Sequence, residues 1–381
     1  MKNDYIAILD YGSSKITCFV GSPSQEGFVI NTIGQSKYSG YSNGEWYEPE
    51  KLAQATSFAI KQAEQNLGER IKNVFVGVAG EFVSVIAGEA SLAFHTNKKV
   101  TKDDISEIFS RANIYREAKG YTAISRSSIY FLINDTLRTV DPIGKVANKL
   151  TGLVSFIFAS DVFCDKVSKA LSSLGVNVTE FISSNLAEAL YLVEPAIRDD
   201  FAVLIDIGYI SSSVMLIGGD GLVFMKSFSL GSGHIIGDLL QVLNIAFPVA
   251  EQLYSGINLN LEFTKTDMYK LKSGVEVEAN KASDIVRARI EDISDYIVKC
   301  FVECEFEIPA TTPVYLTGGG LTYVKGAHEY LGKQLNKNIK IITSANSLTN
   351  RHEFTSSYGL LDLAIKQQKP KKKGLFAKLF S

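Results

Sequence analysis

Two short stretches of the chain share one arrangement of apolar and polar positions. In each, an apolar run typical of a buried strand ends in Asp-x-Gly, and a second apolar run follows the turn. The first stretch spans 6–20 around Asp10, and the second spans 202–217 around Asp206. These are the only two Asp-x-Gly triplets, and their aspartates lie 196 residues apart. We therefore expect two similar strand-turn-strand units that face each other.

Turns of this kind suit a phosphate ligand. Glycine lets the backbone approach a ligand closely, turn amides and hydroxyls can hold phosphate oxygens, and a strand-end aspartate can orient Mg²⁺ or its waters. The simple alternative is a pair of ordinary hairpins in an α/β protein, because short motifs often match by chance. The repetition favours the nucleotide interpretation.

Two further segments are rich in glycine. Residues 231–237 nearly match the dinucleotide-binding fingerprint, but the final spacing differs, so we interpret them as a glycine turn that opens a helix and suits an anion. The strand 314–317 leads into Gly318, Gly319 and Gly320. Three consecutive glycines cost backbone entropy, which predicts that something approaches this turn closely.

Helix and strand patterns alternate between the two Asp-x-Gly turns. Apolar positions at helical spacing predict a helix over 51–67, and the strand 74–78 follows. Residues 81–159 then contain strand-like runs around one helix that starts near Thr101, a residue that can cap it. These runs are Val83–Ile86, Ser91–Phe94, Ile129–Ile133 and Leu153–Phe158. We expect a separate small α+β subdomain here.

Composition and charge fit a cytosolic globular chain. The 381 residues are 46% apolar and 21% charged, which allows two or three domains, and the N-terminal segment does not resemble a signal peptide. Six lysines from Lys366 onward leave 33 basic and 41 acidic residues in the body, a net charge of −8 that argues against nucleic-acid binding. The four cysteines form no Cys-x-x-Cys pair, so we expect reduced, mostly buried thiols.

The basic tail has an amphipathic pattern. On a helix, four large apolar residues would share one face while lysines project from another, as in helices that lie in a membrane interface. The residues predicted to meet the membrane are Lys371, Lys372, Lys373, Leu375, Phe376, Lys378, Leu379 and Phe380. The alternative is a solvated, disordered basic end.

In their order along the chain, these motifs resemble FtsA, the actin-fold family that tethers the bacterial division ring to the membrane. Residues 8–16 resemble its first phosphate loop, 314–320 its adenosine loop and 357–360 its second connecting helix. The insertion at 81–159 sits where this family, unlike other actin-like proteins, places its 1C subdomain. The resemblance covers nearly the whole chain.

The resemblance implies an α/β, actin-like, two-lobed fold, as in sugar kinases and heat-shock chaperone ATPases, with an inserted 1C-type α+β subdomain. It implies the following division: subdomain 1A at 1–80 and 160–195, 1C at 81–159, 2A at 196–235 and 305–366, 2B at 236–304, and a basic linker with a membrane-targeting amphipathic helix at 367–381.

The resemblance also implies ATP and Mg²⁺ as cofactors. Asp10 and Asp206 would orient the metal through water and act in catalysis. The residues that would surround the nucleotide are Gly12, Ser13, Ser14, Lys15, Gly208, Ser211, Ser212, Gly231, Gly233, Arg287, Glu291, Gly318, Gly319 and Gly320. The pair Arg287 and Glu291 could instead be a surface ion pair at helical spacing.

Several positions depart from the family pattern. Tyr209 and Ile210 replace two glycines of the second phosphate loop, and Ser213 replaces its closing aspartate. Ser184 stands where an acid helps orient the attacking water in several relatives, and Tyr254 replaces a lysine expected near the adenosine. Hydrolysis needs a positioned metal and an oriented water, so we expect at most a weak ATPase.

The implied function is an ATP-binding, self-associating adaptor. It would polymerise into protofilaments and dock FtsZ, or a protein like it, on subdomain 2B. Its tail would bind anionic lipids at the cytoplasmic face of the membrane, at the division septum. Two alternatives remain open at this stage: a nucleotide-free membrane-associated scaffold, and an active actin-fold ATPase or small-molecule kinase.

Overall fold

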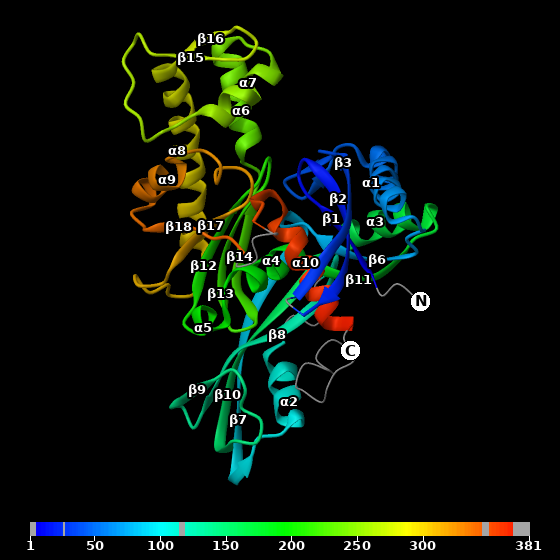
Figure 1. Cartoon of the computed structure of the whole chain (residues 1–381). Helices are drawn as coiled ribbons and strands as arrows, with labels where there is room; N and C mark the ends of the chain where they lie inside the picture. Colours follow the sequence, from blue (N-terminus) through cyan, green and yellow to red (C-terminus); the bar gives the residue numbers. More distant parts are fainter. Residues whose placement is uncertain (1–4, 26, 114–118, 345–349, 369–381) are drawn as a thin grey trace. The chain divides into compact units, whose positions relative to one another are not determined.

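A computed structural model of the chain describes residues 5–25, 27–113, 119–344 and 350–368. The chain divides into two compact units, traced in Figure 1. Unit 1 comprises 1–202, 215–225 and 356–381, and unit 2 comprises 203–214 and 226–355. Strands β13 (Ser212–Gly218) and β14 (Gly221–Phe228) each contribute residues to both units.

The main sheet of unit 1 has the strand order β11-β6-β1-β2-β3. Strands β1 (Ile6–Tyr11), β2 (Lys15–Ser24) and β3 (Gly27–Lys37) are antiparallel neighbours, whereas β6 (Asn73–Val78) and β11 (Asn177–Ser183) continue the sheet in parallel with β1. All six residues of β1 are buried, as expected for a central strand covered on both faces.

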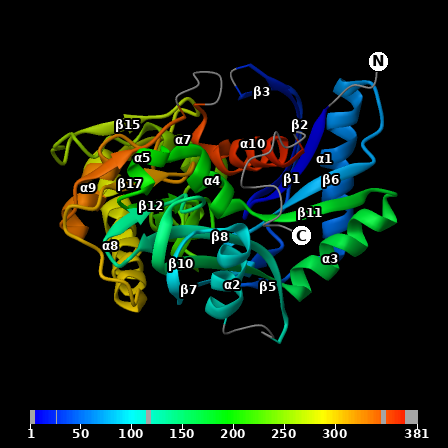
Figure 2. The same ribbon diagram turned by 90° about the horizontal axis from the view of Figure 1, so that it is seen from below.

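Helices cover both faces of this sheet. Helices α1 (Leu52–Leu67) and α3 (Asp161–Ser173) share a core with Leu9, Cys18 and Val20. Strand residues of the opposite parity, Phe19 and Gly21, meet helix α10 (Thr355–Gln368). Figure 2 shows α1 and α3 together on one side of β1 and α10 apart from them. In β1, Leu9 and Tyr11 belong to the core shared with α1 and α3, so Asp10 between them faces the opposite side of the sheet.

The insertion forms its own antiparallel sheet, of order β7-β10-β8-β9. The strands are β7 (Val83–Lys99), β10 (Val146–Ser160), β8 (Tyr121–Ile133) and β9 (Leu137–Thr139). Helix α2 (Lys102–Ala112) packs its apolar side on this sheet. Thr101 caps α2, as predicted, but the runs 83–86 and 91–94 belong to one long strand rather than two.

Unit 2 contains the parallel strands β12 (Ala202–Ile207), β17 (Val314–Thr317) and β18 (Ile339–Ile341), in a sheet of order β14-β13-β12-β17-β18. This order repeats that of the first sheet: an antiparallel three-strand meander followed by two parallel strands. Its helices are α6 (Ser232–Leu243), α7 (Phe247–Gly256), α8 (Ala279–Glu303) and α9 (Ala327–Leu335), with a small hairpin of β15 (Met268–Lys270) and β16 (Glu276–Glu278).

Besides short 3-10 helices at Pro49–Lys51, Gly80–Phe82 and His352–Phe354, the described chain has four further short elements. They are β4 (Tyr41–Ser42), β5 (Glu45–Trp46), α4 (Ser184–Leu192) and α5 (Pro195–Arg198). Among the described residues, no single helix has the length and apolar character to span a membrane, and only α6 and α7 taken together, bent by 114°, meet that test. The predicted helix 51–67 and strand 74–78 are confirmed as α1 and β6.

Candidate functional site

The two Asp-x-Gly turns have the same backbone geometry. In each, the glycine amide donates to the carbonyl oxygen three residues later, from Gly12 to Lys15 and from Gly208 to Ser211, at 3.0 Å in both cases. Each aspartate also lies opposite the next parallel strand, Asp10 beside Gly77 and Asp206 beside Thr317. The predicted duplication of a strand-turn-strand unit is therefore confirmed within each unit.

Asp10 lies among three serine hydroxyls. Its Oδ1 accepts from Ser184 at 3.2 Å, and its Oδ2 accepts from Ser356 at 2.6 Å and from Ser357 at 2.7 Å. The side chain is only 7% exposed. A carboxylate offers about four acceptor positions, so these hydroxyls use three of them.

The fourth acceptor position of the Asp10 carboxylate is where a magnesium ion or its water could be bound. No group of three or more His, Cys, Asp or Glu side chains in the described ranges could hold a metal, but Mg²⁺ typically needs only one or two carboxylates beside phosphates and waters. Taken separately, Asp10 in unit 1 and Asp206 in unit 2 each offer the donor chemistry that such an ion needs. For Asp10 the remaining position allows one contact, with the ion itself or with a metal-bound water, and excludes direct bidentate coordination.

The three glycines after β17 pack against the second turn. Gly318 has a φ of +85°, and a Cβ there would lie 2.1 Å from Asp206 Oδ1. A Cβ on Gly320 would lie 2.5 Å from the carbonyl oxygens of both Ile207 and Gly208, and its amide donates to Ile207 at 2.7 Å. The predicted close approach exists, and the atoms that approach Gly318 and Gly320 are those of the protein's own second Asp-x-Gly turn.

The start of α6 also packs on the second turn. The amides of Ser232 and Gly233 donate to the carbonyl oxygens of Gly208 and Tyr209, at 3.1 and 2.7 Å. A Cβ on Gly233 would lie 2.8 Å from the Tyr209 ring, and one on Gly231 would lie 2.5 Å from the Gly208 carbonyl. These two amides are therefore engaged by the turn rather than directed at an anion.

Two further hydroxyl groups of unit 2 donate hydrogen bonds to backbone carbonyls next to this turn. Ser212, predicted to face the nucleotide, is buried and donates to the Leu230 carbonyl at 2.6 Å. Tyr254 is buried and donates to the Gly320 carbonyl at 2.6 Å, and burial raises its pKa above the ordinary value. A neutral hydroxyl donor thus stands where the resemblance led us to expect a lysine.

Arg287 and Glu291, on α8, both meet Tyr330 of α9. The Arg287 guanidinium lies 6.0 Å from the Tyr330 ring centroid, and Glu291 accepts from the Tyr330 hydroxyl at 2.5 Å. Arg287 forms its ion pair with Asp284, at 3.3 Å. The structure therefore connects these two side chains through Tyr330 and places Arg287 in a different ion pair from the one considered above.

The other predicted site residues have simpler surroundings. Ser13, Ser14 and Lys15 are half-buried in the first turn, and Ser211 is half-buried in the second. Gly319 lies against Glu353, where a Cβ would meet the Glu353 Cβ at 2.9 Å. The tail residues predicted to meet the membrane lie outside the described residues.

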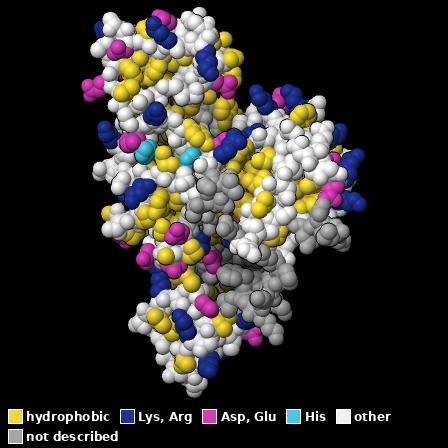
Figure 3. All heavy atoms as spheres, viewed as in Figure 1, with side chains coloured by type: hydrophobic (Ala, Val, Ile, Leu, Met, Phe, Trp, Pro, Cys, Tyr) yellow, Lys and Arg dark blue, Asp and Glu magenta, His cyan; other side chains and the backbone are white. Residues whose placement is uncertain are grey.

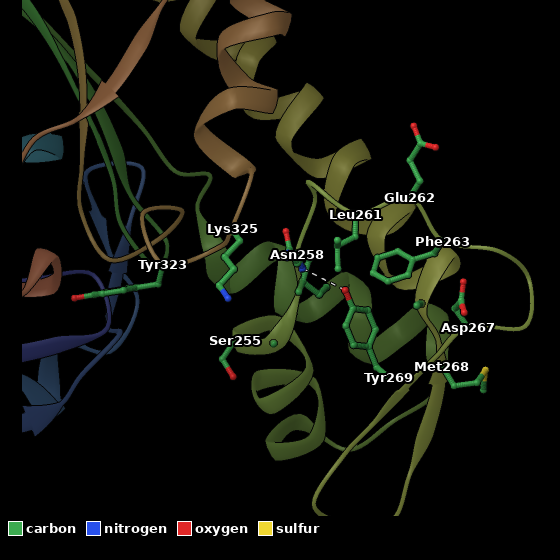
Figure 4. Close-up of a pocket in the computed structure, with 13 residues that line it drawn as sticks. Ser255, Asn258, Leu261, Glu262, Phe263, Asp267, Met268, Tyr269, Tyr323 and Lys325 are labelled. Carbon is green, nitrogen blue, oxygen red and sulfur yellow. Dashed lines mark hydrogen bonds between the residues drawn. The ribbon is translucent and has the colours of Figure 1, made fainter.

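A cavity of about 610 Å³ lies elsewhere in unit 2, between the end of α7, the segment leading to β15 and the loop before α9. Figure 4 shows Leu261, Phe263 and Tyr269 gathered at this cavity, with Lys325 extending from the opposite loop. The backbone amide of Asn258 donates to the Tyr269 hydroxyl at 3.2 Å. The lining thus combines apolar and aromatic side chains with a few charged ones.

Sequence reasoning missed Ser356, Ser357 and the role of Tyr254. The two serines follow Asp10 by 346 and 347 residues, so no local pattern links them to it. The available signal was a pair of hydroxyl residues in the first turn of the predicted connecting helix.

Comparison with known proteins gives the family context. Residues 203–359 match the family model described as cell division protein FtsA. The FtsA of Enterococcus hirae is 22% identical over 364 residues, which cover 93% of this chain and 81% of that protein. The FtsA of Enterococcus faecalis is 23% identical over 321 residues, which cover 82% of this chain and 72% of that protein.

Solved structures share the fold. A chain of the PilM–PilN type IV pilus biogenesis complex matches with a TM-score of 0.64 and 15% identity, over 94% of this chain and 98% of that one. MreB5 of Spiroplasma citri bound to AMPPNP matches with a TM-score of 0.57 and 11% identity, over 96% of this chain and 98% of that one. The fold is the actin-like ATPase fold, and in sequence the chain is similar to the FtsA cell-division proteins.

Proposed function

We propose that this chain is an actin-like adaptor of bacterial cell division, which binds ATP, self-associates into protofilaments and ties FtsZ to the cytoplasmic membrane at the septum. The observation that carries the proposal is the similarity to FtsA proteins over most of the chain, on an actin-like fold. Fold alone does not fix function, so each part needs its own test.

In this proposal ATP is a stabilising ligand with slow turnover. Two features support slow chemistry: Ser184, where an acid was expected, donates to Asp10, and the hydroxyls around Asp10 limit its contact with a metal. When bound, Mg²⁺·ATP would supply a polarised phosphate, and the residues that would hold it are Asp10, Gly12, Ser13, Ser14 and Lys15 of the first Asp-x-Gly turn and Asp206 and Gly208 of the second.

The first experiment is calorimetry with ATP and Mg²⁺, combined with a phosphate-release assay on the same preparation. We expect binding with little or no release. Brisk release that falls in Asp10→Ala would instead indicate an active ATPase or kinase. Absence of any heat or thermal shift would indicate a scaffold that works without nucleotide.

The tail would supply the membrane attachment. Half-burial of its four large apolar side chains would contribute about 4 kcal/mol, and each lysine near anionic lipid would add about 1 kcal/mol, before the cost of ordering the segment. One copy therefore binds weakly, and a protofilament binds firmly because its tails act together.

Liposome pelleting tests this attachment. Deletion of residues 371–381 should abolish pelleting with anionic vesicles, as should the double variant Leu379→Asp/Phe380→Asp, which keeps all the lysines. A matched control, Lys366→Ala, changes one lysine upstream of the tail and should pellet normally. Unchanged pelleting of the deletion variant would refute the membrane proposal.

Docking of FtsZ on subdomain 2B is supported by the cavity at the end of α7. Its lining combines apolar side chains with Lys325 and two acidic residues, Glu262 and Asp267, which suits a short peptide with apolar side chains and charges of both signs. Figure 3 shows hydrophobic side chains at the surface in the region of α7 and β15, where Phe247, Leu261 and Met268 are exposed. Phe263→Ala with Lys325→Ala should weaken co-pelleting with FtsZ, and unaltered binding would exclude this site.

A further inference from the structure

A single carboxylate joins the beginning and the end of unit 1. Asp10 is the last residue but one of β1, Ser184 is the first residue of α4, and Ser356 and Ser357 lie in the first turn of α10. The three hydroxyls donate to Asp10 at 3.2, 2.6 and 2.7 Å. Two helices that are far apart in sequence therefore begin at the same carboxylate.

The groups around Asp10 can stabilise its buried carboxylate without a bound cation. A buried charge is costly unless it is hydrogen-bonded, and here charge-assisted bonds come from three donors. The first turns of α4 and α10 also present the positive ends of their helix dipoles to an anion placed there. Asp10 is thus compensated by the protein itself, although it is almost completely buried.

Helix α10 is seated on unit 1 through close contacts at glycines. A Cβ on Gly359 would lie 2.4 Å from the Ala187 carbonyl oxygen of α4, and one on Gly77 would lie 2.4 Å from Leu360 Cδ1. A Cβ on Gly21 would lie 2.6 Å from Leu361 Cδ2. Such contacts fix both the depth and the rotation of α10, so a restraint on its first turn acts on the whole helix.

We propose that Asp10 is a positioning residue, the anchor of helix α10, and that it holds this role without a metal ion. The chain continues from α10 at Gln368 directly into the basic tail. The functional part of this inference rests on the proposed adaptor role. A force on the membrane-bound tail would be transmitted to the body of the protein through α10, and the hydrogen bonds to Asp10 would hold the start of that helix in place.

Hydrogen exchange of the full-length protein, without nucleotide or Mg²⁺, tests the anchor. The double variant Ser356→Ala/Ser357→Ala should raise exchange of the α10 amides at least tenfold, because it removes two bonds to a charged group. Asp10→Asn should do the same, and combining the changes should add little, since both remove one interaction. Ser106→Ala, a helical serine that donates to the Lys102 carbonyl, is the matched control. Unchanged α10 exchange in the serine variants, or full additivity, would overturn the proposal.

A second variant separates the anchor from a metal site. Ser184→Glu would place a like charge beside Asp10, which a cation can bridge. We expect its thermal midpoint to fall and to recover on adding Mg²⁺ alone, whereas the parent protein should not respond. An equal response of the parent would mean that Asp10 depends on the metal, and the proposal would fail. Failure of the protein to pellet with liposomes would contradict only the proposed adaptor role, because the hydrogen-exchange measurements that test the anchor do not involve a membrane.

Discussion

The hydroxyl of Tyr254, on α7, donates a 2.6 Å hydrogen bond to the carbonyl oxygen of Gly320. Gly320 in turn donates its amide to Ile207, next to Asp206. One buried tyrosine therefore connects a helix of the predicted 2B region with the glycine turn and, through it, with the second Asp-x-Gly turn.

Replacement of Tyr254 by Phe should destabilise this arrangement. The change leaves the ring in place but removes the hydroxyl, which is the side chain's hydrogen-bond donor. The Gly320 carbonyl then loses this partner, at a cost of about 1–3 kcal/mol. Urea unfolding monitored by circular dichroism measures the loss. A cost below about 0.5 kcal/mol would mean that the bond contributes little.

The glycine turn should not tolerate a side chain at Gly318. Alanine there would combine a positive φ with a Cβ 2.1 Å from Asp206 Oδ1, so we expect Gly318→Ala to cost about 2–5 kcal/mol. Thermal unfolding checks this. The control is Gly237→Ala, in α6, where a Cβ would meet nothing within 4 Å and should stabilise the helix by about 0.5–1 kcal/mol. Equal effects of the two changes would contradict the structure.

The inserted subdomain offers an independent test at Thr101. Its hydroxyl accepts from the Asp104 amide, and Asp104 accepts from the Thr101 amide, so Thr101→Ala should cost about 1 kcal/mol. Hydrogen exchange over 102–112 should accelerate, whereas Thr101→Ser should behave like the parent protein. If serine and alanine gave the same exchange rates, the hydroxyl would not be the cap.

His234 should make the start of α6 sensitive to acid. Burial, assisted by Arg289, lowers the pKa of its imidazole below the ordinary value of 6.5, and Nδ1 accepts from the Gly231 amide at 3.1 Å. A lowered pKa in the folded state means that the stabilisation is complete above pH 6.5 and is lost as the pH falls through the folded pKa. An NMR titration, assigned with His234→Gln, checks this. A midpoint at or above 6.5 would refute it.

The local patterns of the sequence predicted the elements that carry both turns. Hydrophobic runs of strand length marked β1, β2, β12 and β13, and helical spacing marked α1. The pattern failed where periodicity alone could not show where a strand ends. Residues 83–86 and 91–94 belong to one strand, because β10 pairs with every residue from Val83 to Ala93. Continuity of a strand depends on its neighbour.

The candidate site divides in the same way. The sequence by itself determined that Asp10 and Asp206 lie at the ends of strands, next to glycine turns, and that three glycines require a close approach. These are properties of backbone sterics and local pattern. Only the tertiary structure decided that Ser356 and Ser357 meet Asp10 and that the second turn fills the space beside Gly318. Hydrogen bonds and close contacts between distant segments depend on how helices pack on a sheet, and that packing is a property of the whole chain.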